Sequence, residues 1–276
     1  KSHNYTTLCE ATPGIIWVGG YMSGMYNINK HSMKVSYFSP SKYGDGKLQP
    51  DKYINSIIKD SNGYIWAGGY YNLKCIDLKN KKIRLYPGIN SVNIIIEKDA
   101  KHMWIASSNG LYLLNKDSGT FRRVKTPKET YIYALHQEKN GLLYIGTCGS
   151  GMLVYNAKTN NFVSYNKENS ALISDDVYTI LSDQEGALFL STENSLTRFK
   201  IAKESFQNWT KEQGLISDHF NSTSGTYRQK GTFVFGSSDG AIEFDKKTTL
   251  PQKYYSKLVF SDFHLFYQSV SAEEKE

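Results

Sequence analysis

The sequence predicts an all-β protein, specifically a β-propeller of four-stranded antiparallel blades, from three observations. The apolar runs are short and rich in aromatic and β-branched residues, with 21 Tyr, 13 Phe and 4 Trp among 276 residues, a composition that favours strands. Strand and turn signals alternate along the whole chain and recur at a near-constant spacing. A lone four-stranded sheet cannot bury both of its apolar faces, whereas radial repetition buries each face against a neighbouring sheet.

The clearest single unit is the stretch 131–166, which predicts four strands of one antiparallel meander. The expected strands are Tyr131–Gln137, Leu142–Gly146, Met152–Asn156 and Phe162–Tyr165. The Asn140-Gly141 hairpin signal separates the first two strands, and turns rich in Gly or polar residues separate the others. The same succession of strands and turns recurs in the rest of the chain.

An apolar triplet that ends in a small residue marks the second strand of each repeat. Its six copies are Trp17-Val18-Gly19, Trp66-Ala67-Gly68, Trp104-Ile105-Ala106, Tyr144-Ile145-Gly146, Phe189-Leu190-Ser191 and Val234-Phe235-Gly236. They recur about every 38 to 49 residues, in the range of four-stranded propeller blades. A turn rich in Gly, Ser or Asn follows each copy and leads into a third strand.

We therefore expect a propeller over residues 1–250 with one blade in each repeat. The repeats span about 1–41, 53–87, 91–125, 131–166, 176–210 and 220–248. The sixth repeat shows no clear fourth strand before Pro251. Residues 251–276 are expected to form a linker and one apolar strand at Lys257–Val270. We expect that strand to dock on the last blade or to pair with another chain, because an exposed apolar edge invites pairing.

The sequence fits the patterns of other repeat classes, and of known catalytic and calcium-binding loops, less well. The chain has no Trp-Asp dipeptide of the WD40 type, and Trp17 and Trp66 precede their glycine doublets, whereas kelch repeats have the opposite order. The segment 236–240 matches a nucleophile elbow, but it lies between two expected strands rather than between a strand and a helix. Asp60-Ser61-Asn62-Gly63 opens like a calcium loop, but position 71 is Tyr where an EF-hand needs an acid. We expect both segments to be hairpin turns.

Charge and cysteine content narrow the function classes. The formal charge of +7, from 33 basic and 26 acidic residues, is too moderate to indicate nucleic-acid binding by itself. Cys9, Cys75 and Cys148 are odd in number and far apart, so we expect buried free thiols. The six His show no metal-ligand spacing, and we expect neither a metal nor a cofactor. No apolar run is long enough for a membrane span, and the first residues show neither Met nor a signal-peptide layout, so we expect a piece of a longer protein.

Several stretches resemble one family of repeats. The form I-W-x-G-[GT]-x-x-x-G-[LM], with an upstream D-x-N-G turn, is typical of the two-component regulator propeller repeat, and Ile16–Met25 and Asp60–Trp66 are similar to it. Gly214–Asn221 together with Phe235–Gly240 resembles the closing blade of that family. Lys257–Val270 resembles the first strand of the small β-sandwich, the Y-Y-Y domain, that follows such propellers. The resemblance covers nearly the whole chain.

The resemblance implies an extracytoplasmic sensor module of a hybrid two-component signalling protein. Such a module detects an oligosaccharide and passes the signal into a phosphorelay through a histidine kinase located elsewhere in the protein. The implied location is periplasmic, with no catalytic residue in this chain. The implied partners are the oligosaccharide, another propeller of the same protein, the Y-Y-Y domain and a second copy in a homodimer, but not nucleic acid. Family propellers usually have seven blades, so either a blade precedes Lys1 or this ring closes with six.

Blade geometry indicates where a ligand site would lie. The turns between second and third strands and the linkers between blades emerge on one side of the ring, here called the loop face, and irregular loops often carry function. Aromatic rings there would cover the apolar faces of sugars, and polar groups would bind their hydroxyls. The candidate ligand-binding residues are Tyr21, Tyr70, Tyr71, Asn109, Asn194, His219 and Asp239. The alternative is that Tyr70 or Tyr71 packs between blades.

The opposite side of the ring, here called the lysine face, collects basic residues. Its expected turns hold Lys30, Lys34, Lys79, Lys81, Lys82, Lys116, Lys158, Lys200, Lys203, Lys246 and Lys247. We expect these side chains to lie in solvent, and their position argues against a nucleic-acid groove on the loop face. Two other functions stay open. One is a non-catalytic scaffold for dimerisation or protein docking; the other is a propeller lyase or glycosidase, although facing sets of carboxylates and histidines are not visible.

Overall fold

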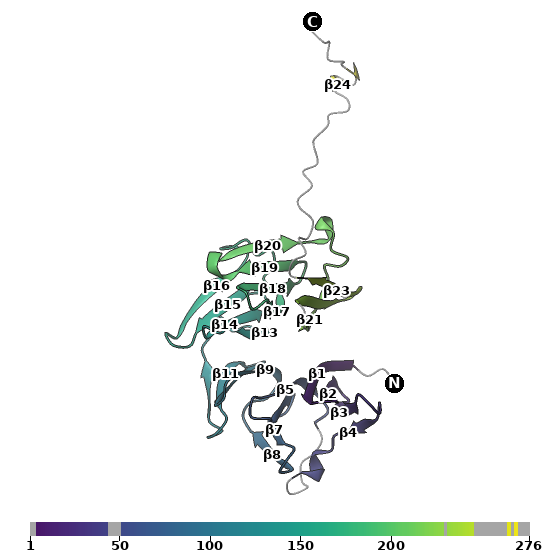
Figure 1. Cartoon of the computed structure of the whole chain (residues 1–276). Helices are drawn as coiled ribbons and strands as arrows, with labels where there is room; N and C mark the ends of the chain where they lie inside the picture. The colour runs from purple at the N-terminus through teal and green to yellow at the C-terminus, as the bar shows by residue number, and fades with distance from the viewer. Residues whose placement is uncertain (1–3, 44–50, 229–230, 246–263, 266–267, 270–276) are drawn as a thin grey trace.

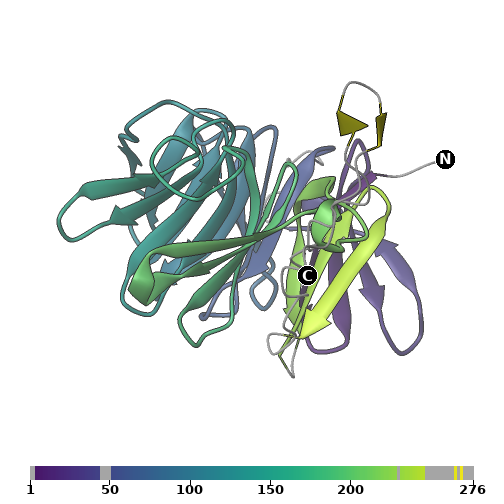
Figure 2. The same cartoon turned by 90° about the horizontal axis from the view of Figure 1, so that it is seen from above.

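The computed structural model describes residues 4–43, 51–228, 231–245, 264–265 and 268–269. Within these ranges the chain is all β apart from three short 3-10 turns, and it forms six antiparallel blades (Figure 1). Seen from above, the blades stand side by side as separate sheets (Figure 2). No helix in the described ranges is long and apolar enough to cross a membrane. The predicted all-β propeller with six blades is confirmed.

Each blade is a meander whose strands follow one another from the centre of the ring to its rim. Blade 1 consists of β1 (Asn4–Thr12), β2 (Ile15–Tyr21), β3 (Gly24–Asn29) and β4 (Val35–Tyr37). Blade 2 consists of β5 (Ile54–Lys59), β6 (Ile65–Gly69), β7 (Leu73–Asp77) and β8 (Lys82–Tyr86). Blade 3 consists of β9 (Val92–Asp99), β10 (His102–Ser107), β11 (Gly110–Asn115) and β12 (Phe121–Val124).

The second half of the ring repeats this arrangement. Blade 4 consists of β13 (Ile132–Gln137), β14 (Leu142–Thr147), β15 (Met152–Asn156) and β16 (Asn161–Tyr165). Blade 5 consists of β17 (Val177–Ser182), β18 (Ala187–Thr192), β19 (Leu196–Lys200) and β20 (Ser205–Trp209). Blade 6 consists, in the described residues, of β21 (Phe220–Arg228), β22 (Thr232–Ser237) and β23 (Gly240–Asp245).

The small residue at the end of each repeat triplet lets neighbouring blades approach closely. A Cβ atom on Gly19 would lie 2.5 Å from Cγ2 of Ile54, in the first strand of the next blade. A Cβ atom on Gly68 would lie 2.4 Å from Cγ1 of Val92, again in the following blade. Side chains cannot pack this closely, so glycine is what allows the inner strand of one blade to lie against the second strand of the previous one. The sequence marker of the repeat is therefore a packing requirement.

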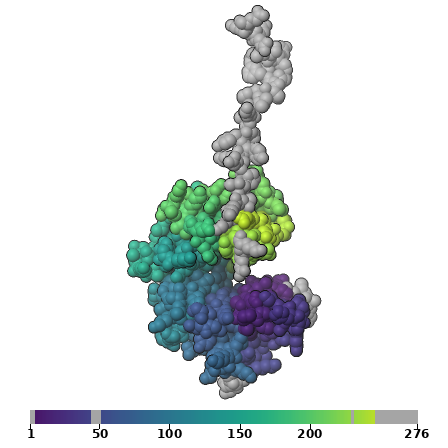
Figure 3. Space-filling model, in the orientation of Figure 1, coloured from purple at the N-terminus to yellow at the C-terminus, as the bar shows by residue number. Residues whose placement is uncertain are grey.

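Apolar clusters fill the five junctions between successive blades. Trp17 and Ile65 belong to the cluster between blades 1 and 2, and Phe189 and Phe233 to the cluster between blades 5 and 6. The three remaining clusters fill the junctions between blades 2 and 3, 3 and 4, and 4 and 5. Among the described residues, no such cluster joins blade 6 back to blade 1. In the space-filling view these two blades lie on the same side of the molecule with an indentation between them (Figure 3).

The two motifs that resemble functional loops are turns between strands, as the sequence predicts. Asp60 Oδ1 accepts the backbone N–H groups of Asn62 at 3.1 Å and Tyr64 at 2.9 Å, and its Oδ2 accepts Nε1–H of Trp66 at 2.9 Å. The segment 236–240 joins β22 to β23, and the Ser237 hydroxyl donates to the carbonyl of Gly240 at 2.8 Å. The Asp60 carboxylate therefore organises its own hairpin.

The end of the chain differs from the single apolar strand expected at Lys257–Val270. Residues 246–263 lie outside the described part, so the linker predicted there has no structural counterpart to compare. The described residues further on form β24 (His264–Leu265) and β25 (Gln268–Ser269), which pair with each other. Neither strand pairs with blade 6. These four residues therefore do not supply a fourth strand of blade 6, and the alternative, pairing with another chain, stays a prediction.

Candidate functional site

Three of the predicted ligand residues lie together on the loop face. The ring centroids of Tyr21 and Tyr53 are 4.9 Å apart, those of Tyr53 and Tyr70 5.8 Å, and those of Tyr70 and Tyr71 5.2 Å. Tyr21, Tyr70 and Tyr71 are 53, 60 and 53 % exposed, so they do not pack in the core between blades. We call these four residues, Tyr21, Tyr53, Tyr70 and Tyr71, the tyrosine ladder.

A glycine and a buried ion pair hold the ladder in place. A Cβ atom on Gly69 would lie 1.6 Å from the carbonyl oxygen of Tyr53, and the same carbonyl accepts the N–H of Tyr70 at 3.3 Å. Asp51 accepts the N–H of Tyr53 at 3.2 Å and Nζ of Lys74 at 2.8 Å. Asp51 and Lys74 are both buried, so the pair fixes the base of the ladder without adding net charge.

The other four predicted residues are exposed but stand in separate parts of the loop face. Asn109 lies between β10 and β11, and Asn194 lies between β18 and β19. His219 precedes β21 with a side chain that is 72 % exposed, and its carbonyl accepts the N–H of Ser238, the neighbour of Asp239, at 3.0 Å. The structure therefore brings His219 next to the turn that holds Asp239. In the described part of the chain we find no contact that links these four residues to the tyrosine ladder.

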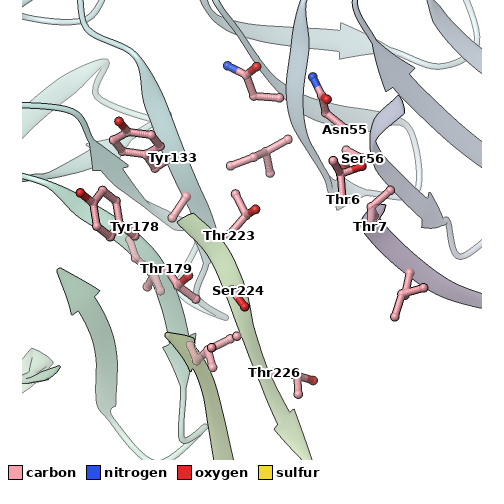
Figure 4. Close-up of a pocket in the computed structure, with 18 of the residues that line it drawn as sticks. Thr6, Thr7, Asn55, Ser56, Tyr133, Tyr178, Thr179, Thr223, Ser224 and Thr226 are labelled. Carbon is pink, nitrogen blue, oxygen red and sulfur yellow. The ribbon is translucent and has the colours of Figure 1, made fainter. Parts of the chain in front are cut away.

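A hollow of about 750 Å³ lies at the centre of the ring, lined by the inner strands of all six blades. Thr6 and Thr7 of β1 lie on one side of it, Tyr133 and Tyr178 lie on the other, and Thr223 and Ser224 of β21 lie between them in this view (Figure 4). Side chains of β22 and β23 also line the hollow, so it extends into the open junction between blades 6 and 1. An extended ligand could therefore enter from the side of the ring as well as from the loop face.

Hydroxyl and amide groups make up the polar part of this wall. They belong to Tyr5, Thr6, Thr7, Asn55, Ser56, Asn93, Tyr133, Tyr178, Thr179, Thr223, Ser224 and Thr226. None of the described residues that line the hollow is Asp, Glu, Lys, Arg or His, although Asp, Glu, Lys and Arg make up 21 % of the sequence. The hollow therefore presents hydrogen-bond donors and acceptors without net charge.

Some of these polar groups bond to other parts of the protein, and two have no partner in it. The Asn55 side chain donates through Nδ2 to the carbonyl of Val92 at 3.0 Å, which ties two inner strands together. In contrast, Nδ2 of Asn93 and Oγ1 of Thr179 are buried and have no hydrogen-bond partner in the protein. Because both atoms are closed off from solvent, a ligand could bond to them only if these side chains turned into the hollow.

A second row of tyrosines lies where the hollow meets the loop face. The ring centroids of Tyr131 and Tyr133 are 5.1 Å apart, as are those of Tyr133 and Tyr178. A hydrogen bond with Cys148 raises the pKa of Tyr133, and burial raises the pKa of Tyr178. Both phenols are therefore neutral near pH 7 and can donate and accept hydrogen bonds. Cys148 is exposed, not buried as predicted, because it lies in the turn between β14 and β15 beside this row.

The sequence prediction missed Tyr53, Tyr133 and Tyr178. One signal was available, because a tyrosine stands near the start of the first strand in several repeats, as Tyr5 and Tyr53 do in the first two. Side chains of such a strand point alternately to opposite faces, and a shift of one residue exchanges the two faces. The spacing of the repeats does not fix that register, so the hollow could not be assigned from sequence.

One lysine expected in solvent on the lysine face is buried. Lys116 is 7 % exposed, and its Nζ pairs with Asp60 Oδ2 at 3.1 Å and with Glu97 Oε1. A smaller cavity of about 530 Å³ lies beside it, and both acidic and basic side chains line this cavity, Arg84 among them. Lys116 therefore joins blades 2 and 3. Of the other lysines predicted on this face, Lys246 and Lys247 lie outside the described residues.

Comparison with known sequences identifies the repeat. The model of the two component regulator propeller family matches residues 48–71, which include the Asp60–Trp66 segment. Histidine kinase P4 of Formosa agariphila is 21 % identical over 278 residues, an alignment that covers 92 % of this chain and 20 % of that protein. The chain thus spans one fifth of the length of this relative.

Solved structures share the architecture. The extracellular domain assigned to a hybrid two component system of B. thetaiotaomicron has a TM-score of 0.64 and 18 % identity, covering 84 % of this chain and 32 % of that chain. A catalytically inactive virginiamycin B lyase from Staphylococcus aureus has a TM-score of 0.69 and 13 % identity, covering 87 % and 79 %. Because the fold is common to such different proteins, function has to be argued from the site. The resemblance drawn from the sequence is nevertheless confirmed: the chain is a six-bladed β-propeller in which residues 48–71 match the two component regulator propeller family.

Proposed function

We propose that this chain is the extracytoplasmic ligand-sensing module of a hybrid two-component signalling protein. It detects an oligosaccharide and passes the signal to a histidine kinase in another part of the same protein, with the module itself located in the periplasm. The observation that carries this proposal is the pairing of two rows of exposed and half-buried tyrosines with a polar hollow at the centre of the ring. No step of catalysis is assigned to this chain.

The chemistry of the site suits a sugar. Pyranose rings present apolar C–H faces, which pack on phenol rings, and hydroxyl edges, which hydrogen-bond to amides and hydroxyls. The tyrosine ladder and the row from Tyr131 to Tyr178 supply the rings. Hydroxyl groups of the wall, among them those of the exposed Thr223 and Thr226, supply polar partners inside the hollow. A hollow of about 750 Å³ is within the size range of small-ligand sites, which extends to roughly 1,000 Å³.

The known relatives support the signalling part of the proposal. The curated relative is named a histidine kinase, and one solved neighbour is the extracellular domain of a protein assigned to a hybrid two component system. In both comparisons this chain covers a third or less of the other protein. A sensor module of this kind would act together with the remaining domains of the same protein, including a further propeller and a Y-Y-Y domain.

Calorimetric titration of the chain with a panel of plant and host oligosaccharides tests the proposal. We expect at least one member to bind, and we expect Tyr70→Ala to weaken that binding about tenfold through loss of ring contact. Tyr64→Ala is the matched control, because Tyr64 is 38 % exposed but precedes β6 on the lysine face. Failure of the whole panel to bind, or equal weakening by both variants, would contradict the proposal.

A non-catalytic scaffold is the second candidate function. Leu8 of β1 is 69 % exposed beside the open junction, and such a side chain favours contact with another protein or a second copy. Sedimentation of the chain and of its Leu8→Ser variant separates the two functions. The scaffold is favoured if the chain assembles, if Leu8→Ser abolishes that assembly, and if no sugar changes the melting temperature.

A further inference from the structure

We infer that the ligand of this site is a neutral oligosaccharide, and that the site selects against sugars that carry carboxylate or sulfate groups. The inference rests on the proposed function and narrows it to one chemical class. It comes from the arrangement of hydroxyl and amide side chains around a hollow whose described lining contains no charged residue.

The buried cation at the base of the tyrosine ladder is neutralised within the protein, and the exposed Lys52 beside Tyr53 lies outside the described lining of the hollow. Lys74 pairs with Asp51 at 2.8 Å, and both side chains are less than 10 % exposed. Lys74 is therefore not free to bind a carboxylate or sulfate of a ligand in the charge-assisted manner that recognition of such groups uses. Arg123 of β12 pairs with Glu129 of the following linker at 2.8 Å, and neither residue lines the hollow.

The charged group at the second tyrosine row is negative. Asp176 Oδ1 accepts the N–H of Gly149 at 3.1 Å, and Asp176 immediately precedes the strand that carries Tyr178. An anionic sugar that stacked on Tyr133 and Tyr178 would approach this carboxylate. Like charges at such a site repel one another, so the mouth of the hollow disfavours anions.

Inside the hollow, desolvation separates the two ligand classes. A sugar hydroxyl that leaves water can bond to hydroxyl groups of the wall, such as those of the exposed Thr223 and Thr226. A carboxylate that leaves water loses a much larger hydration free energy and meets no opposite charge in the described wall. Such a site binds a neutral sugar more tightly than a sugar of the same size that carries a carboxylate.

The experiment compares each hexose oligosaccharide of the panel with its C6-oxidised form, in which carboxylates replace the primary hydroxyls. Calorimetry with the intact chain at pH 7 gives both dissociation constants. We expect the oxidised form to bind at least about 30-fold more weakly, the loss expected for an unpaired charge.

Two variants of β21 show whether the hollow causes this preference. Thr226 is exposed and lines the hollow, so Thr226→Lys adds a cation there, and we expect it to reduce the preference for the neutral sugar at least about tenfold. Ser222 is exposed on the same strand but outside the lining, so Ser222→Lys adds the same charge without that effect. Near-ultraviolet circular dichroism checks that both variants are folded.

The possible results distinguish failure of the neutral-ligand inference from failure of the proposed function. Equal or tighter binding of the oxidised sugar by the wild-type chain overturns the neutral-ligand inference and leaves the proposed function standing. An equal change in preference in both variants also overturns it, because general charge would then explain the result. If neither form of any sugar binds, the proposed function fails and the inference fails with it.

Discussion

At the scale of single residues, buried polar groups join the blades on the lysine face. Lys116 of blade 3 reaches Asp60, whose side chain is 0 % exposed, at the turn before the second strand of blade 2. Asp60 also accepts Nε1–H of Trp66, the aromatic residue of the repeat triplet. One carboxylate therefore organises a hairpin, orients a core tryptophan and binds the neighbouring blade.

Replacing Asp60 by Ala should lower the free energy of unfolding by about 3 kcal/mol or more, because it leaves a buried ammonium and a buried indole N–H without this partner. Urea denaturation measures the change. Asp117→Ala is the control, since Asp117 is exposed near the same cavity and its loss should change the free energy of unfolding by less than about 0.5 kcal/mol. Similar losses in the two variants would show that the Asp60 contacts do not stabilise the fold.

Glu138 gives the junction between blades 4 and 5 a dependence on pH. It accepts the Ser182 hydroxyl at 2.7 Å and contacts His136 Nε2 at 2.9 Å. Burial acts to raise the pKa of Glu138, but these hydrogen bonds together hold the pKa below its ordinary value of 4.5. A lowered folded-state pKa means that the carboxylate stabilises the fold above the unfolded value, and that this contribution is lost as the pH falls through the folded-state pKa.

The wild-type chain should therefore lose more free energy of unfolding between pH 7 and pH 3 than Glu138→Gln does. Denaturation curves at the two pH values measure both differences. Glu129→Gln serves as the control, because Glu129 has a side chain that is 82 % exposed. If Glu138→Gln kept the full acid sensitivity of the wild type, the stabilising carboxylate would have to be another one.

At the scale of elements, the end of a second strand positions the proposed ligand site. Gly68 and Gly69 close β6, and both allow contacts that a side chain would block, with Val92 of the next blade and with the backbone of Tyr53. Tyr70 follows directly and enters the ladder. The same two glycines thus serve the packing of blades and the placement of exposed rings.

Gly69→Ala should destabilise the chain by about 2 kcal/mol or more, since the added Cβ meets backbone rather than a movable side chain. Gly141→Ala is the matched control. Gly141 has open space around its Cβ position but a φ of 89°, so the substitution should cost only about 1 kcal/mol. Gly69→Ala should also weaken sugar binding, which Gly141→Ala leaves unchanged. Thermal denaturation and calorimetry give the two readouts, and an undiminished affinity in Gly69→Ala would mean that the ladder is not part of the site.

At the scale of the whole molecule, the ring has five filled junctions and one open one among the described residues. Blades 1 and 6 are each covered by a neighbour on one face, whereas blades 2 to 5 are covered on both. In repeat architectures stability depends on contacts between neighbours. The open junction also forms one side of the hollow, so the same feature affects both stability and access for a ligand.

Hydrogen exchange should therefore be faster in β2 and β22, within the end blades, than in β10 and β14, within the central ones. A bound sugar that contacts both β1 and β21 should slow exchange in both end blades, and at a ligand concentration of about 100 times the dissociation constant it should add about 2.7 kcal/mol of stability. Mass spectrometry of exchanged peptides measures the pattern. Uniform protection across all six blades would show that the junction between blades 6 and 1 is as stable as the others.

The sequence by itself determined the propeller, its six repeats and the hairpin turns, and it placed Tyr21, Tyr70 and Tyr71 in the turns of the loop face. These features follow from alternation, turn chemistry and repeat spacing, all of which act over a few residues or one period. The tertiary structure alone decided that Tyr53 completes the ladder, that Lys116 is buried and that an uncharged hollow opens between the first and last blades. Each of those features joins residues from different blades. Their contacts depend on strand register and on the distance between sheets, which local patterns in the sequence do not specify.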